Sequence, residues 1–135
     1  MRIIERVRAL SLPTDEVVVI GSGVLDALDL REAGDVDLVV SLNRFERLKN
    51  DNAWHVGEKN GEPIAVMTDV EAFLSWGSNG VPNFNELYDA GVTIQGIRFA
   101  HPRFVVEWKR QRASEKDLHD IALLEEYMRH YDIGN

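Results

Sequence analysis

The sequence has no cysteine, no long apolar run and no excess of basic residues. Without cysteine the chain can form neither disulfides nor thiolate–zinc sites, and it has no cysteine nucleophile. No apolar run approaches the ~20 residues of a transmembrane helix, and residues 1–12 contain no apolar stretch of signal-peptide length. We therefore expect a cytoplasmic protein that makes no membrane contact.

The charge balance is acidic, with 23 acidic and 15 basic residues and a formal net charge of -8. Such a surface repels nucleic acid, so a protein that binds nucleic acid nonspecifically is disfavoured. Hydrophobic residues make up 44% of the chain and charged residues 28%, close to the average for folded proteins. The 135 residues contain no repeat or linker and predict one domain, residues 1–135.

Periodicity and turn residues predict an alternation of helices and strands. Helices are expected at 1–12, 22–32, 43–48, 85–90, 102–108 and 114–131, and strands at 16–20, 35–42, 54–56, 63–67, 92–94 and 97–100. Asn60-Gly61 is the strongest turn signal and predicts a hairpin. Asn43 is expected to cap one helix, and Ser114 with Asp117 another. Residues 72–88 have a poor pattern and are expected to be mostly loop with short helical pieces.

Asp35 and Asp37 lie at the start of an apolar run, separated by Val36. Because strand side chains alternate, both carboxylates are expected on the same face of a sheet. Two carboxylates held close repel each other, and a divalent cation such as Mg²⁺ or Mn²⁺ best compensates them while leaving room for phosphate. Metal ions bound in this way can activate an attacking hydroxyl and neutralise a leaving pyrophosphate.

Gly21-Ser22-Gly23 directly precedes a predicted helix. Free backbone N–H groups at such a turn attract phosphate, and glycine permits its close approach. Taken alone, such a turn is more often plain loop chemistry than a phosphate site, and acids are common at exposed strand ends. A phosphate-binding turn followed, one helix later, by a metal-binding acid pair is what nucleotide transfer requires.

In this order and spacing, Gly21-Ser22 and Asp35-Val36-Asp37-Leu38 resemble the motif of the nucleotidyltransferase superfamily, which shares the polymerase-beta-type catalytic core. Arg31 is similar to an arginine that many compact members carry just before the acid pair. The resemblance implies an α/β (α+β) domain with a mixed, mostly antiparallel sheet and helices mainly on one side.

The stretch FAHPRFVVEWKRQRASEKDLHDIALLEEY resembles the tail of compact bacterial members, including abortive-infection toxins and antibiotic-modifying transferases. The matching positions are Lys109, Arg112, Lys116, Asp117 and Asp120, so the resemblance spans about residues 17–127.

The spacing of the basic residues in this tail agrees with a phosphate-binding role. Lys109, Arg112 and Lys116 follow at intervals of three and four, so one continuing helix would present them on one side, where they could bind a triphosphate. Alternatively they form a solvated stripe paired with nearby acids, and Asp117 and Asp120 complement a helix dipole.

The resemblance also implies a third acid on a neighbouring strand. Asp69 is the best candidate, and Glu71, which has the same strand parity, is the substitute. Asp69 could instead cap a helix through Ala72 and Phe73.

The sequence therefore predicts metal-dependent transfer of a nucleoside monophosphate from a nucleoside triphosphate to an acceptor hydroxyl. Asp35, Asp37 and Asp69 are the expected metal-binding and catalytic residues, while Gly21, Ser22, Gly23, Lys109, Arg112 and Lys116 are expected to bind the nucleotide. The acceptor could be a small molecule, a protein or an RNA end, and a homodimer or partner protein could complete the cleft. The alternative is a catalytically silent binding or regulatory protein of the same fold, as in a toxin–antitoxin type pair. Trp54, Trp76 and Trp108 are expected to pack in the core or line the cleft.

Overall fold

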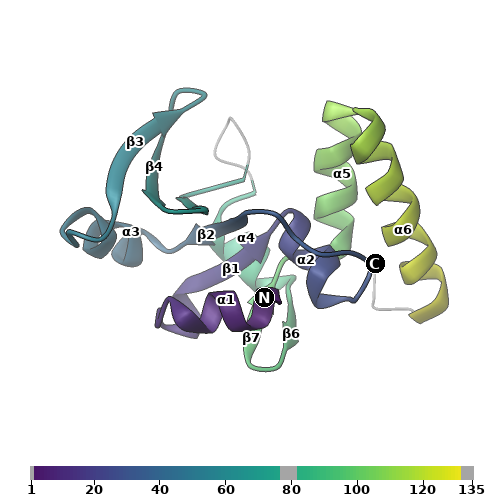
Figure 1. Ribbon diagram of the computed structural model, residues 1–135, viewed down its shortest axis with the longest axis horizontal. Helices are drawn as coiled ribbons and strands as arrows, with labels where there is room; N and C mark the ends of the chain where they lie inside the picture. The colour runs from purple at the N-terminus through teal and green to yellow at the C-terminus, as the bar shows by residue number, and fades with distance from the viewer. Residues whose placement is uncertain (1, 77–81, 132–135) are drawn as a thin grey trace.

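A computed structural model describes residues 2–76 and 82–131 of the chain (Figure 1). The helices are α1 (Ile3–Ala9), α2 (Ser22–Ala27), α3 (Leu42–Lys49), α4 (Phe84–Asp89), α5 (Pro102–Arg112) and α6 (Glu115–Tyr131), with a 3-10 turn, η1, at Thr14–Glu16. The strands are β1 (Val17–Ile20), β2 (Val36–Val40), β3 (His55–Lys59), β4 (Glu62–Met67), β5 (Val70–Phe73), β6 (Val92–Ile94) and β7 (Ile97–Phe99).

The described strands form one mixed sheet in the order β3-β4-β5-β2-β1-β7-β6. Strand β1 runs antiparallel to β2 and parallel to β7, and the central strand β2 runs parallel to β5. The remaining pairs, β3 with β4, β4 with β5 and β6 with β7, are antiparallel. The expected α+β fold with a mixed, mostly antiparallel sheet is confirmed.

The core lies around β1, because all four of its residues are buried. Helices α1 and α2 pack against the face of β1 that carries Val19. A Cβ atom added to Gly23 would lie 2.6 Å from Val19 Cγ1 and 3.2 Å from Ile3 Cδ1. Glycine at position 23 therefore lets α2 approach both the sheet and α1, since any larger residue would collide with them.

The predicted hairpin is confirmed, with Asn60 and Gly61 both at positive φ between β3 and β4, as a two-residue turn requires. The largest error concerns β5, because residues 70–73 pair with both β2 and β4 where a poor sequence pattern predicted loop from residue 72. Helix α2 is shorter than predicted and ends at Ala27, and α3 is capped by Ser41, whose Oγ accepts from Arg44 N, rather than by Asn43.

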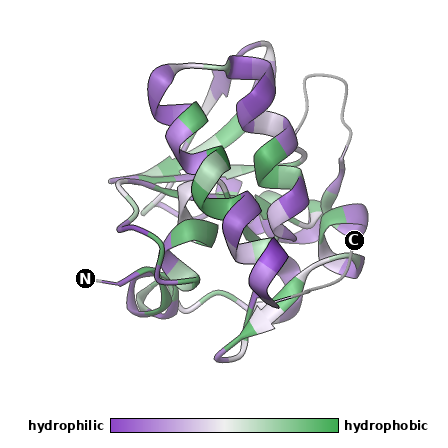
Figure 2. Cartoon of the chain, turned by 90° about the vertical axis from the view of Figure 1, so that its right-hand side faces the viewer, coloured by the Kyte–Doolittle hydropathy of each residue, from purple (hydrophilic) through white to green (hydrophobic). Residues whose placement is uncertain are grey.

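Helices α5 and α6 form an antiparallel hairpin beside one end of the sheet (Figures 1 and 2). The prediction of two separate helices is confirmed. Because Ala113 adopts a left-handed conformation (φ +50°) and the chain reverses, Lys109, Arg112 and Lys116 do not lie on one continuing helix. The predicted cap of the last helix is confirmed: Asp117 N donates to Ser114 Oγ over 3.1 Å, and Ser114 N donates to Asp117 Oδ2 over 3.2 Å. In Figure 2 hydrophilic and hydrophobic residues alternate along both helices, as expected when one side of each is buried.

Across residues 2–76 and 82–131, no helix combines the length and apolar character needed to span a membrane.

Candidate active site

A pocket of about 490 Å³ lies between the sheet and the helical hairpin. On the sheet side, its lining comes from the end of β1, the start of β2, the end of β5 and the tip of the β3–β4 hairpin. On the helical side, the lining comes from α5 and the start of α6. Of the predicted site residues, the lining includes Gly21, Ser22, Asp35, Asp37, Lys109, Arg112 and Lys116, but not Gly23, Asp69 or its substitute Glu71.

Strand register places carboxylates next to each other at one edge of this pocket. Asp37 pairs with Ile20 on β1 and with Glu71 on β5, so the three side chains share one face of the sheet. Asp35 precedes Asp37 by two residues and is exposed at the pocket's rim. The predicted proximity of Asp35 and Asp37 follows from this backbone geometry, and Glu71 adds a third carboxylate.

Asp35, Asp37 and Glu71 together form what we call the acid group. Its negative charge exceeds the positive charge of the basic side chains around it. Burial, together with the charges of Glu71 and Asp35, raises the pKa of Asp37 to about 6, while Lys59 and Arg112 act in the opposite direction. A carboxyl group with a pKa in this range binds protons or cations more readily than a free aspartate.

Lys59 supplies part of the missing positive charge. Its Nζ lies 3.0 Å from Glu71 Oε1 and 3.3 Å from Oε2, and it sits 5.9 Å from the centre of the Phe73 ring. Because Lys59 ends β3, these contacts show that the β3–β4 hairpin bends over the face of β5. The Lys59 side chain is 49% exposed, so it can move away from Glu71 without opening the core.

The described residues contain no group of three His, Cys, Asp or Glu side chains arranged to enclose a metal ion. A closed protein cage is not what Mg²⁺ requires, since it is commonly held by one or two carboxylates and completed by water and substrate phosphates. The raised pKa of Asp37, caused by burial and by the neighbouring carboxylates of Glu71 and Asp35, fits a cation held in that open manner.

Gly21 brings the main chain against this acid group. It adopts φ +66° and ψ -142°, a conformation that is essentially restricted to glycine. A Cβ atom at this position would lie 3.4 Å from Asp37 Oδ2. Gly21 therefore serves the pocket, whereas Gly23, which was also predicted to bind nucleotide, serves the packing of α2.

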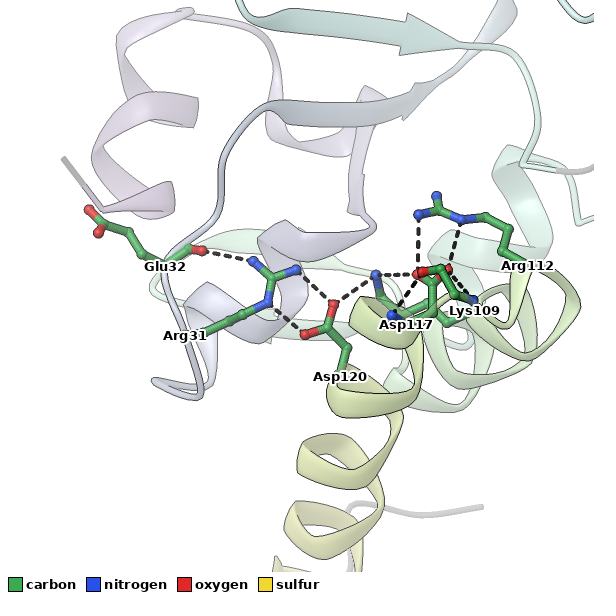
Figure 3. Close-up of polar contacts among 7 residues, drawn as sticks. Arg31, Glu32, Lys109, Arg112, Asp117 and Asp120 are labelled. Atoms are coloured by element: carbon green, nitrogen blue, oxygen red, sulfur yellow. Dashed lines mark hydrogen bonds and ion pairs between the residues drawn. The ribbon is translucent and has the colours of Figure 1, made fainter.

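On the opposite side of the pocket, Asp120 holds two cations in place (Figure 3). Arg31 binds it through two hydrogen bonds, Nε to Oδ1 over 2.6 Å and Nη2 to Oδ2 over 2.7 Å, and Lys109 Nζ lies 3.0 Å from Oδ2. Burial alone would raise the pKa of Asp120, but the hydrogen bonds from Arg31 and Lys109 outweigh it and hold that pKa below its usual range.

Asp117 orients basic side chains on the same side of the pocket. Arg112 donates to it from Nε and Nη2 over 3.3 and 3.1 Å, and Lys109 Nζ lies 3.6 Å away. Burial works against ionisation here too, but hydrogen bonds from Ser114 and the charges of Arg112 and Lys109 keep the pKa of Asp117 low. Lys116, exposed at the start of α6, completes the cationic wall formed by Arg31, Lys109, Arg112 and Lys116.

The third acid is better placed at Glu71 than at Asp69. Asp69 is exposed in the turn between β4 and β5 at φ +62°, and its carbonyl oxygen accepts from Val36 N over 2.8 Å. The alternative in which Asp69 caps a helix is wrong, because Ala72 and Phe73 belong to β5.

Several pocket residues were missed from the sequence, namely Lys59, Asn60, Glu62, Phe73 and Ser75. The first three belong to a hairpin that was predicted, but no local signal shows that it bends over the pocket. The last two lie on or after the strand that was missed. Trp76 and Trp108, expected in the core or the cleft, both line the pocket.

Comparison of the chain with protein-family models, with curated proteins and with solved structures gives no significant match in any of the three.

Proposed function

We propose that this protein is a metal-dependent nucleotidyltransferase, which moves a nucleoside monophosphate from a nucleoside triphosphate to an acceptor hydroxyl. The charge arrangement of the pocket supports this proposal most. The acid group on one side is not fully neutralised by its neighbours, and the basic side chains of the cationic wall on the other side are already held in position. A triphosphate bound to a divalent cation carries both complementary charges.

In this proposal Asp35 and Asp37 hold Mg²⁺ or Mn²⁺, with Glu71 as the third acid and Asp69 as the weaker candidate. The metal would supply charge neutralisation of the phosphates. A carboxylate of the group accepts the proton of the acceptor hydroxyl as its oxygen bonds to the α-phosphorus and pyrophosphate departs.

The cationic wall holds the phosphates. Lys109 is only 6% exposed and is oriented by Asp117 and Asp120, so its position is fixed before a ligand arrives. Positive groups that need no rearrangement stabilise developing negative charge most effectively. Arg112 and Lys116, being more exposed, contact the outer phosphates, and Ser22 and the Gly21 backbone contact them from the strand side.

The alternative is a catalytically silent binding protein of the same fold, acting with a partner protein. The ion pair between Lys59 and Glu71 favours it, because one carboxylate of the acid group is already neutralised within the chain.

Calorimetric titration of nucleoside triphosphate, with and without Mg²⁺, into the wild type and an Asp35→Ala, Asp37→Ala variant tests the proposal. Binding that needs Mg²⁺ in the wild type and disappears in the variant is the expected result. Metal-dependent binding that survives unchanged in the variant contradicts the proposed site, and no binding by the wild type favours the silent alternative.

A further inference from the structure

Two tryptophans line the pocket and take no part in the charge arrangement described above. The rings of Trp76 and Trp108 lie 5.8 Å apart, centre to centre, at an interplanar angle of 38°, and both residues line the pocket. Trp76 is 8% exposed, whereas Trp108 is only partly buried. Trp108 therefore has ring surface free to meet a ligand, and the ring of Trp76 packs against it.

We infer that Trp108 is the nucleobase-binding residue of this pocket, positioned by Trp76, and that the ligand is a base-bearing nucleotide rather than a simpler phosphate compound. This inference rests on the proposed function. A 5.8 Å separation leaves no room for a base between the two rings, so the base stacks on the pocket side of Trp108 alone.

The position of Trp108 on α5 matches the layout of a nucleotide. Trp108 and Arg112 are four residues apart, so they are neighbours on one helix face, with Cβ atoms about 5–6 Å apart. Lys109 follows Trp108 directly and lies in the cationic wall. A base stacked on Trp108 would place its phosphates, one ribose away, beside Arg112 and Lys109.

Asp35 and Asp37 of the acid group line the same pocket as Trp76 and Trp108. A ligand that contacts both the acids and the aromatic pair needs a charged end and a flat uncharged end. A nucleoside triphosphate has this form, whereas inorganic triphosphate has only the charged end.

The test compares nucleoside triphosphate with inorganic triphosphate, both with Mg²⁺, by calorimetry on the wild type and Trp108→Ala. The wild type is expected to bind the nucleotide more tightly, and Trp108→Ala to weaken nucleotide binding roughly 5- to 100-fold, the range for loss of one stacked base, without changing the affinity for inorganic triphosphate. Trp54→Phe, a substitution of a buried tryptophan outside the pocket lining, is the matched control and should bind both ligands as the wild type does.

Tryptophan fluorescence of the Trp54→Phe protein provides a second measurement that does not depend on the folding of Trp108→Ala. Its emission comes from Trp76 and Trp108 alone, and stacking should make nucleotide quench it while inorganic triphosphate does not. Equal wild-type affinity for the two ligands, an equal loss of both in Trp108→Ala, or nucleotide binding without quenching would overturn the inference. Failure of the wild type to bind either ligand would overturn the proposed function as well, which separates the two failures.

Discussion

Two acid pairs in this chain have opposite electrostatic surroundings. Asp117 and Asp120, on α6, are fully buried, yet each contacts two basic side chains and has a pKa below its usual range. Asp37, on β2 two residues after Asp35, has Glu71 as its strongest charged influence and a pKa of about 6. The helix pair therefore acts as a scaffold that orients cations, whereas the strand pair retains a charge that an external cation can neutralise.

Removal of the scaffold acid should have the largest effect. Asp120→Ala leaves the buried amine of Lys109 and the guanidinium of Arg31 without their shared partner. Because loss of one member of a buried ion pair typically costs about 3–5 kcal/mol, we expect a decrease of that size in the free energy of unfolding, measured by urea denaturation. Glu125→Ala, which removes an exposed pair with Arg110, is the control and should cost less than about 1 kcal/mol. An equal, small effect of both changes would show that Asp120 is not a scaffold.

Removal of the charge of Asp37 should have the opposite effect and increase the free energy of unfolding. An unfolded aspartate has a pKa near 3.8, whereas folded Asp37 has a pKa of about 6. As pH rises through this interval the unfolded chain loses its proton first, so this group lowers stability by up to about 3 kcal/mol above about pH 6. Asp37→Asn should therefore raise the free energy of unfolding near neutral pH.

The pH dependence checks the cause of that gain. The difference in stability between Asp37→Asn and the wild type should grow from about pH 4 to about pH 6 and then level off, because Asp37 alone distinguishes the two proteins. A difference that does not change with pH would mean that packing, not charge, explains the gain.

A smaller effect is expected from the third acid, for which Glu71 and Asp69 are the two candidates. Glu71→Gln should weaken Mg²⁺-dependent nucleotide binding by about 10-fold, a change typical of groups that tune a metal site, because Glu71 lies in register with Asp37. Asp69→Asn is the matched control and should bind as the wild type does, since Asp69 is exposed in the turn before β5 and is not in register with Asp37. A larger loss in Asp69→Asn would restore Asp69 as the third acid.

Lys59→Met should have the smallest effect on stability, within about 1 kcal/mol, because the ion pair with Glu71 is half exposed. Its electrostatic effect is specific, since Lys59 lowers the pKa of Asp37 and its loss should move that pKa above 6. Carboxyl titration by NMR measures the shift. An unchanged titration of Asp37 would show that Lys59 does not compensate the acid group.

The sequence was sufficient to predict what depends on local pattern. The α+β fold was implied by the resemblance of the motifs. The acid pair, the Asn60-Gly61 turn and the cap formed by Ser114 and Asp117 follow from spacing and turn chemistry alone. These features need no knowledge of distant residues, because each is determined by neighbours within a few positions.

What could not be predicted depends on long-range pairing. Strand β5 is too short to show alternation, and its place beside β2 makes Glu71 a neighbour of Asp37. The scaffold role of Asp120 depends on Arg31, 89 residues away in the sequence. Two helices were predicted for the basic residues, but local spacing could not show that the left-handed turn at Ala113 brings Lys116 to the same pocket as Lys109 and Arg112.

The central claim is that the acid group on the strands retains a charge for an external cation. The most direct test is the free energy of unfolding of the wild type and Asp37→Asn, with excess Mg²⁺ and with chelator, at about pH 5 and about pH 8. Because protons compete with metal for Asp37, Mg²⁺ should stabilise the wild type more at the higher pH and leave Asp37→Asn unchanged at both. Equal stabilisation of the two proteins by Mg²⁺ would contradict the account.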